Sequence, residues 1–335
     1  MTVRVNKPEF NLIEKLTELE RPIGLKGSEL MRAETTQEAR DFVSAGRKNF
    51  LMNGNFIISQ RGDYTTAAVA VTDDLYYLDR WKMRRSTVGA TIQRQLVTLP
   101  NNQKVYSLNL AATSAGNGYL AIRQVIEDIN SLSNQDVTLS CWVRGSGPAL
   151  YFRHWGATNI GDPIYPTNEW QYVSRRYRFG DVTSLSDGSS SGATMAFTNY
   201  DGNVAINSGD YFEIAQFQIE VGKNATEFEH RSIGEELALC QRYYFKSLAT
   251  RQSIFYKGPL WESNWYSFPV EMRANPTLSG GSWFLRNPGS NSNISYSGFV
   301  NTMFRTGFYV TSNTTNTNTL QCWFNDAPLT ATAEL

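Results

Sequence analysis

Residues 213–244 read EIAQFQIEVGKNATEFEHRSIGEELALCQRYY and carry the clearest strand and helix signals of the chain. Every second residue of the first part is apolar, with glutamine or glutamate in between: Ala215, Phe217, Ile219 and Val221. A period of two is typical of a β-strand with one buried face. A turn follows at residues 222–224, and residues 232–239 show a short helical pattern. The block therefore predicts a strand, a turn and a short helix in succession.

The same strand predicts an irregularity in its own pairing. Phe212 and Ile214 are out of phase with Phe217 and Ile219, so the alternation skips one residue. One extra residue in a strand indicates a β-bulge, which we expect near residues 214–215.

Further strand candidates precede this block, and glycine or polar clusters separate them at turn-like spacings. They are residues 55–59, 67–71, 92–99, 105–110, 119–125, 137–144, 149–155, 172–179 and 194–199. The clearest is 137–144, with Trp142 and Arg144 on one face and an apolar set on the other: Val137, Leu139, Cys141 and Val143. So many short strands favour a jelly-roll β-sandwich, and the fold class is predicted to be mainly β.

Residues 1–48 are charged and show helical spacing instead of alternation. Two short helices are expected, the second from Thr35, and their narrow apolar stripes include Phe10, Ile13, Leu16 and Leu19, then Phe42 and Val43. Stripes this narrow bury too little surface to fold independently, so we expect this segment to dock onto a partner protein, onto other copies of the same chain or onto the next domain. The sequence thus predicts a helical segment (1–48), a jelly-roll sandwich (49–232) and a smaller C-terminal β domain (233–335).

The balance of charge excludes several classes of partner. The chain has 31 Lys and Arg against 31 Asp and Glu, so no global field recruits nucleic acid. The basic run at residues 82–85 is interpreted as a solvated loop. No stretch approaches the roughly 20 apolar residues of a membrane span, and the first ten residues lack a secretory apolar core. We expect a soluble protein that is made in a cytoplasm and does not insert into membranes.

No catalytic or metal site is predicted. The histidines, His154 and His230, lie in no nucleophile or zinc motif, and His154 is in phase with the apolar residues of a strand. The acidic pair at residues 73–74 is interpreted as a solvated turn, and LDRW at residues 78–81 as buried core with a polar network. The three cysteines lie far apart without metal-ligand spacing. No nucleotide-binding glycine pattern occurs, so we expect a protein without cofactor that is not an enzyme.

Aromatic residues are the strongest functional signal, with 8 Trp, 17 Tyr and 18 Phe. Aromatic faces stack on sugar rings, and neighbouring Asn, Asp, Arg and Gln side chains bind the hydroxyl groups. Two clusters are candidate glycan-binding residues: Trp155 with Tyr165 and Trp170, and Trp261 with Trp265 and Tyr266. For the second cluster, packing against a neighbouring subunit stays open as an alternative.

Several blocks, taken in order, resemble the tail fibres of tailed bacteriophages. Residues 8–49, PEFNLIEKLTELERPIGLKGSELMRAETTQEARDFVSAGRKN, look like the virion-attachment segment of podovirus and cyanophage-like fibres. NFLMNGNFIISQRG, LDRW, VTLSCWVRG and the block ending in CQRYY follow, and FPVEMRANPTL and TAEL come last. The order of these blocks along most of the chain carries the resemblance.

The resemblance implies a homotrimeric, structural virion protein of the tail, synthesised in the host cytoplasm. Residues 1–48 would bind the tail tube, nozzle or adaptor proteins, and the β domains would recognise a host-surface glycan, with residues 233–335 at the distal tip. It also implies a middle domain similar to galactose-binding-like carbohydrate modules. Many of those hold a structural calcium with a carboxylate just after the NGNF strand, where this chain has Ile57, so no calcium is predicted. A tail adaptor without receptor contact and a polysaccharide depolymerase stay open as alternatives.

Overall fold

The structure is a computed structural model that describes residues 48–127, 129–154, 158–181, 193–200, 204–247, 253–255, 262–279, 282–287, 292–294, 300–312, 321–325 and 329–334. The chain divides into two compact units, Met1–Lys48 and Asn49–Leu335. The helices predicted for the first unit lie outside the described residues, as do Phe10, Ile13, Leu16, Leu19, Phe42 and Val43.

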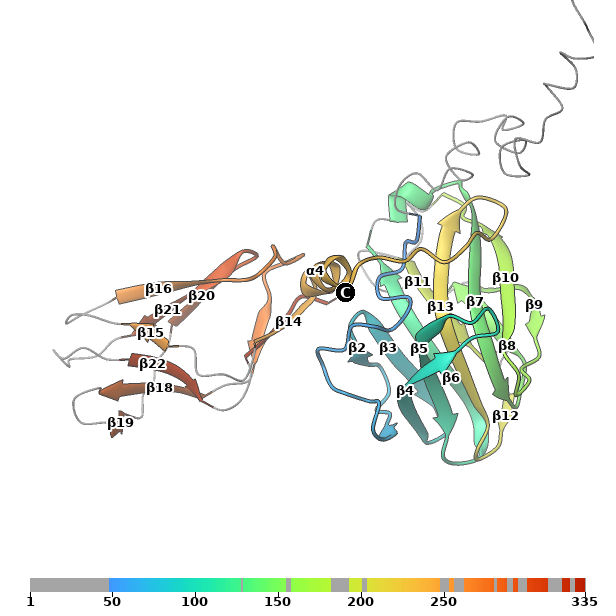
Figure 1. Cartoon of the computed structure of the whole chain (residues 1–335), viewed down its shortest axis with the longest axis horizontal. Coiled ribbons are helices and arrows are strands. Elements are labelled where there is room, and N and C mark those ends of the chain that lie inside the picture. The colour runs from blue at the N-terminus through green and yellow to red at the C-terminus, as the bar shows by residue number, and fades with distance from the viewer. Residues whose placement is uncertain are drawn as a thin grey trace, which may run out of the picture. The chain divides into compact units, whose positions relative to one another are not determined.

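Two antiparallel sheets pack face to face as a β-sandwich (Figure 1). Sheet A has the strand order β1 (Val69–Ala70), β4 (Ala90–Thr98), β5 (Lys104–Ala112), β13 (Tyr211–Val221), β7 (Asp136–Ser146) and β10 (Gln171–Arg178). Sheet B has the order β2 (Leu75–Leu78), β3 (Trp81–Ser86), β6 (Gly116–Ile126), β11 (Ala193–Thr198), β8 (Leu150–His154) and β9 (Thr158–Ile164), and β12 (Val204–Ile206) pairs with β6. The short 3-10 helix η1 (Ile129–Leu132) follows β6. The prediction of a mainly β chain is confirmed.

The core between the sheets is built around aromatic rings. Trp81 stacks on Phe217 with ring centroids 5.6 Å apart, and Phe152 lies 5.6 Å from the same ring. All three side chains are fully buried. Because one buried aromatic side chain removes about 150–250 Å² from water, each of these rings contributes a large share of the apolar area that the core buries.

The bulge predicted near residues 214–215 is present in β13, slightly later in the strand, between Ala215 and Gln218. Ala215 pairs with Trp142 and Gln218 with Ser140, so two residues of β13 oppose Cys141 alone. Gln216, one of the two, has φ of +52°. The extra residue resets the phase of the strand, so apolar residues on both sides of the bulge face the same core.

Two local predictions are wrong. Residues 55–59 form no strand, because Asn53 and Phe56 both have φ of +56° and the backbone of Ile58 bonds to the Asn53 side chain instead of to a neighbouring strand. Residues 82–85 form no solvated loop: they belong to β3, where Lys82 and Arg84 face outward and Arg85 donates to the carbonyl of Val71 at 2.7 Å.

The helix predicted at residues 232–239 is α4 (Ile233–Gln241), and the Ser232 side chain caps its N-terminus by accepting from Glu235 N. Beyond it, short strands form three small antiparallel sheets. They are β14 (Tyr244–Lys246), β23 (Thr330–Thr332) and β17 (Thr277–Ser279); β15 (Ser253–Phe255), β22 (Gln321–Asn325), β18 (Ser282–Asn287) and β19 (Ser292–Ile294); and β16 (Glu262–Ser267), β21 (Gly307–Ser312) and β20 (Val300–Phe304).

These strands have a core of their own, which includes Phe245, Phe268, Met272 and Phe308. The domain boundary between residues 232 and 233 stays a prediction. Among the described residues, no helix has the length and apolar character needed to cross a lipid bilayer.

Gly54 provides a direct test of how the loop after Asn49 packs on β13. Phe217 N donates to Gly54 O at 2.8 Å, and a Cβ on Gly54 would lie 2.2 Å from Phe217 O. We expect Gly54→Ala to lower the free energy of unfolding by about 3 kcal/mol, because the clash is with backbone. Gly234→Ala, in α4 with open space around it, should instead raise stability by about 0.5–1 kcal/mol. Equal effects of the two substitutions in urea unfolding would contradict the packing.

Candidate functional site

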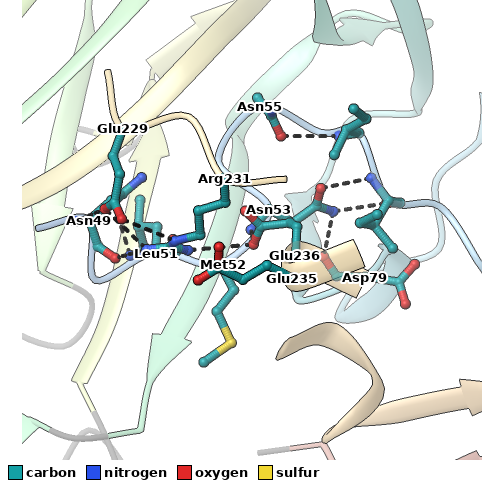
Figure 2. A network of polar contacts seen from close by, with 12 residues as sticks. Asn49, Leu51, Met52, Asn53, Asn55, Asp79, Glu229, Arg231, Glu235 and Glu236 are labelled. Carbon is teal, nitrogen blue, oxygen red and sulfur yellow. Dashed lines mark hydrogen bonds and ion pairs between the residues drawn. The ribbon is translucent and has the colours of Figure 1, made fainter. Parts of the chain in front are cut away.

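Two of the sequence blocks meet in a buried polar network (Figure 2). Asn53, from the NGNF block, donates its backbone N–H to Glu236 Oε1 of α4 at 2.5 Å. Its side-chain amide donates to the carbonyls of Ile58 (2.8 Å) and Asp79 (3.0 Å) and accepts from Ile58 N at 2.9 Å. The indole of Trp81 donates to Asn53 O at 2.8 Å. Asn53 therefore organises a loop, and its polar atoms are all engaged within the protein.

Arg231 closes the other side of the network. It donates to the carbonyls of Asn49 and Leu51 and forms ion pairs with Glu229 (3.3 Å) and Glu236 (3.5 Å). Burial raises the pKa of the Glu236 carboxyl, while the Asn53 N–H and Arg231 act in the opposite direction. The NGNF block and the segment before α4 are thus one structural unit, which holds the loop after Asn49 against the sandwich.

A second buried cluster joins the sandwich to the last β-strand. We call Arg61, Arg80, Tyr243, Tyr244 and Glu334 the Arg80 joint. The guanidinium of Arg80 lies 3.5 Å from the ring centre of Tyr243, and its Nη1 is 2.5 Å from Glu334. Arg61 lies 3.8 Å over the ring of Tyr244 and 2.7 Å from the same carboxylate. The prediction that residues 78–81 are core with a buried polar network is confirmed.

The outer face of sheet A carries a different arrangement. Strand registers place four polar residues directly opposite one another on four adjacent strands: Gln93 (β4), Asn109 (β5), Glu213 (β13) and Arg144 (β7). We call these four residues the polar row. Their sequence neighbours are buried in the core, so the row itself faces away from it: Ile92, Leu110, Ile214 and Val143. Since neighbouring strands lie about 4.8 Å apart, the row spans about 14 Å.

An ion pair lies at one end of the polar row. Arg144 Nε and Nη2 approach Glu213 Oε2 at 2.8 and 2.7 Å, and Ser107 Oγ donates to Glu213 Oε1. The side chain of Glu213 is 1% exposed, whereas that of Arg144 is 30% exposed. The carboxylate of Glu213 is therefore buried under the Arg144 side chain, and the guanidinium of Arg144 is the part of the ion pair that reaches solvent.

Aromatic side chains line the same end of the row. The guanidinium carbon of Arg144 lies 4.8 Å from the ring centre of Trp170. Trp142 and Tyr172 are cross-strand neighbours with ring centroids 5.4 Å apart. Both tryptophans pack against a small apolar cluster of Leu99, Val105 and Ala215, which holds their rings in place. The outer face of sheet A thus presents a rigid aromatic edge beside hydrogen-bonding groups.

The predicted aromatic clusters are placed only in part. Trp155 and Trp261 lie outside the described residues. Tyr165 follows β9 and is 71% exposed, and Trp170, from the same predicted cluster, borders the polar row.

Trp265 and Tyr266 point to opposite faces of β16, because successive strand residues alternate. Tyr266 stacks on Phe308 of the second core with centroids 5.0 Å apart. Trp265 is 40% exposed, lies 5.8 Å from the ring of Phe304, and donates its indole N–H to Ser267 at 2.8 Å. Of this pair, only Trp265 is exposed to solvent and available to a ligand, whereas Tyr266 packs in the second core.

The polar row itself was missed from the sequence. The alternation in residues 137–144 already places Arg144 and Trp142 on the face opposite the apolar residues. Gln93, Asn109 and Glu213 carry the same signal in their own strands. What joins them is strand order and register, which the sequence does not display.

His154 and Asp74, two titratable residues considered in the sequence, both contact other side chains of the protein. His154 is buried, its Nδ1 lies 3.3 Å from the Tyr177 hydroxyl, and its ring packs on Phe179. Asp74 lies in the predicted turn but pairs with Lys82 and Arg123 as well as facing solvent. Within the described ranges, no group of three or more His, Cys, Asp or Glu side chains is placed to hold a metal ion.

No protein-family model and no curated protein matches the chain. Among solved structures, it is similar to the enzymatically active domain of tailspike protein 4 of bacteriophage CBA120, with a TM-score of 0.34 and 11% identity over 52% of this chain and 21% of that one. It is also similar to a family 11 carbohydrate-binding module of Clostridium thermocellum in complex with a β-1,3-1,4-mixed-linked tetrasaccharide (TM-score 0.27, 13% identity, 47% and 96% covered). An exo-β-agarase matches with a TM-score of 0.31 and 14% identity over 48% of this chain and 26% of that one.

Proposed function

We propose that this protein is a glycan-binding attachment protein and that the outer face of sheet A is its binding surface. The observation that carries the proposal is the polar row with its aromatic edge. Amide and guanidinium groups there lie in line across the strands, with the carboxylate of Glu213 buried beneath Arg144, beside Trp170, Trp142 and Tyr172. Such a combination suits a sugar, whose ring presents C–H groups to an aromatic face and hydroxyls to polar side chains.

The geometry of the row favours a chain of sugars over a single one. A row of about 14 Å is longer than one pyranose ring, and its side chains repeat at the strand spacing of about 4.8 Å. The amide of Asn109 carries both donor and acceptor and can bond hydroxyls in either orientation, whereas the amide oxygen of Gln93 already accepts from Gln95 Nε2 at 2.9 Å, so Gln93 offers mainly its amide N–H groups. The ligand would run across the strands from Gln93 toward Trp170.

The biological setting that we propose follows the sequence resemblance. Residues 1–48 would attach the protein to the tail of a bacteriophage, the chain would form a homotrimer, and the β domains would bind glycan on the host surface without catalysis. Three copies of a weak site on one fibre raise the avidity for a repetitive surface. Light scattering of the full chain checks the trimer, and a monomer would favour the alternative of a tail adaptor that assembles only on the virion.

Binding by the polar row is tested with an array of purified bacterial surface glycans. We expect the full-length protein to bind a subset of them. The double substitution Gln93→Ala with Asn109→Ala should weaken that binding by roughly five- to 150-fold, because each lost hydrogen bond is worth about 0.5–1.5 kcal/mol. Both side chains are half-buried on the outer face and absent from the core, so the fold should persist.

Asn117→Ala, an exposed position on β6 of sheet B, is the matched control and should bind like the unmodified protein. The proposal fails if no glycan is bound, or if the double variant binds as well as the control.

A further inference from the structure

We propose that Glu213 makes the polar row selective for uncharged glycans, by neutralising Arg144 from below. The inference rests on the proposed function and adds the class of ligand to it: oligosaccharides without carboxylate, phosphate or sulfate groups at the subsite beside Trp170.

Glu213 is bound on both oxygens by the protein itself. Oε1 accepts from Ser107 Oγ, and Oε2 accepts from Arg144 Nε at 2.8 Å. With 1% of its side chain exposed, the carboxylate is inaccessible to a ligand that lies on the face. Its role there is electrostatic: it supplies a fixed negative charge directly beneath the guanidinium.

Arg144 is the group that a ligand meets. Its side chain is 30% exposed, and its guanidinium carbon lies over the ring of Trp170, 4.8 Å from the ring centre, so the two groups are held together at this end of the row. A guanidinium has five N–H donors, and the two that point at Glu213 leave others for sugar hydroxyls. Arg144 therefore offers directed hydrogen bonds while its positive charge is compensated.

The rows on either side of the polar row add no further charge; Arg176 and Glu220, both opposite Thr138 on the same face, lie three rows away from Arg144. The two rows of residues directly beside the polar row are uncharged. They are Gln95, Ser107, Ala215, Trp142 and Tyr172 on one side, and Thr91, Ala111, Tyr211 and Ser146 on the other. Glu169, exposed next to Trp170, is the nearest charged residue in the sequence at that end. A sugar carboxylate placed here would compete with Glu213 for Arg144 and would lie close to a like charge.

The first test compares glycan classes on the unmodified full-length protein. On an array that contains neutral, uronate-bearing and phosphate-bearing bacterial glycans, we expect binding to neutral ones, and an affinity that changes less than twofold between about 20 and 500 mM NaCl. Preference for anionic glycans, or a loss of affinity above tenfold over that salt range, would overturn the inference while leaving the proposed function standing. Absence of binding to any class would remove the proposed function and the inference with it.

The second test reverses the selectivity. Glu213→Gln keeps the shape and an acceptor for Ser107 but leaves Arg144 uncompensated, so binding of anionic glycans should rise at least tenfold while neutral binding changes less. Glu169→Gln removes the same charge close by without touching Arg144 and should not produce this gain. The double substitution Glu213→Gln with Arg144→Gln should abolish it. Unchanged selectivity between neutral and anionic glycans in folded Glu213→Gln would contradict the inference. If that variant does not fold, the salt dependence of glycan binding by the unmodified protein tests the inference instead.

Discussion

Glu334→Ala is expected to lower the free energy of unfolding by about 3–5 kcal/mol. The carboxylate of Glu334 is 6% exposed and is shared by Arg61 and Arg80, whose own side chains are 14% and 1% exposed. Removing it leaves the guanidinium of Arg80 buried without a counter-charge. Stacking on Tyr243 and the bond to Val125 O at 2.7 Å would remain, but neither supplies negative charge.

The measurement is urea unfolding followed by tryptophan fluorescence, with Glu271→Ala as the matched control. Glu271 also pairs with an arginine, Arg305, at 2.9 Å, but both side chains are about half exposed. Water screens that pair, so its loss should cost less than about 1 kcal/mol. If the two variants are equally stable, the Arg80 joint does not bind the last strand to the sandwich as described.

Asn53→Ala is expected to cost about 3–5 kcal/mol of unfolding free energy. The substitution removes three side-chain hydrogen bonds and leaves the carbonyl of Asp79 and both backbone groups of Ile58 without these partners in a buried place. It also puts a Cβ-bearing residue without a compensating side-chain bond at φ of +56°, which costs about 1 kcal/mol.

Two further variants separate these contributions. Asn53→Gly relieves the backbone strain and keeps the hydrogen-bond loss, so it should recover only about 1 kcal/mol. Asn55→Ala, whose side chain accepts one long bond from Ile57 N at 3.4 Å, should cost less than about 1 kcal/mol. Full recovery in the glycine variant would show that the network in Figure 2 contributes little beyond backbone geometry.

The sheet framework was predictable wherever the two faces of a strand differ in chemistry. In β7 and β13, alternation is so regular that strand, buried face and even the bulge follow from residue types alone. The helix α4 could equally be predicted from the sequence, because Ser232 caps it and two glutamates follow in the first turn.

Local propensity failed where tertiary contacts override it. Residues 55–59 are rich in β-forming side chains, yet the bonds of Asn53 to Ile58 and Asp79 hold them in an irregular loop. The three positive charges at residues 82–85 had led to the prediction of a solvated loop. In β3 they alternate, with Lys82 and Arg84 paired to acidic residues on the outer face and Arg85 bonded to loop carbonyls.

The candidate site could be predicted only in fragments. Trp170 was a candidate because it is one of the 8 tryptophans of the chain and aromatic faces bind sugars. Arg144 could be assigned to an outward face from the alternation in its own strand. Glu213 and Gln93 come from strands that are distant in the chain, and only the order β4-β5-β13-β7 brings them into line. Register between strands is set by long-range packing, which residue types in one segment do not encode.

The most direct test of the central claim is a crystal structure of the protein with a glycan that it binds on the array. We expect an oligosaccharide on the outer face of sheet A, bonded to Arg144 and Asn109, with one ring against Trp170. A glycan bound instead at the exposed Trp265 of β16, or on the outer face of sheet B, would contradict it.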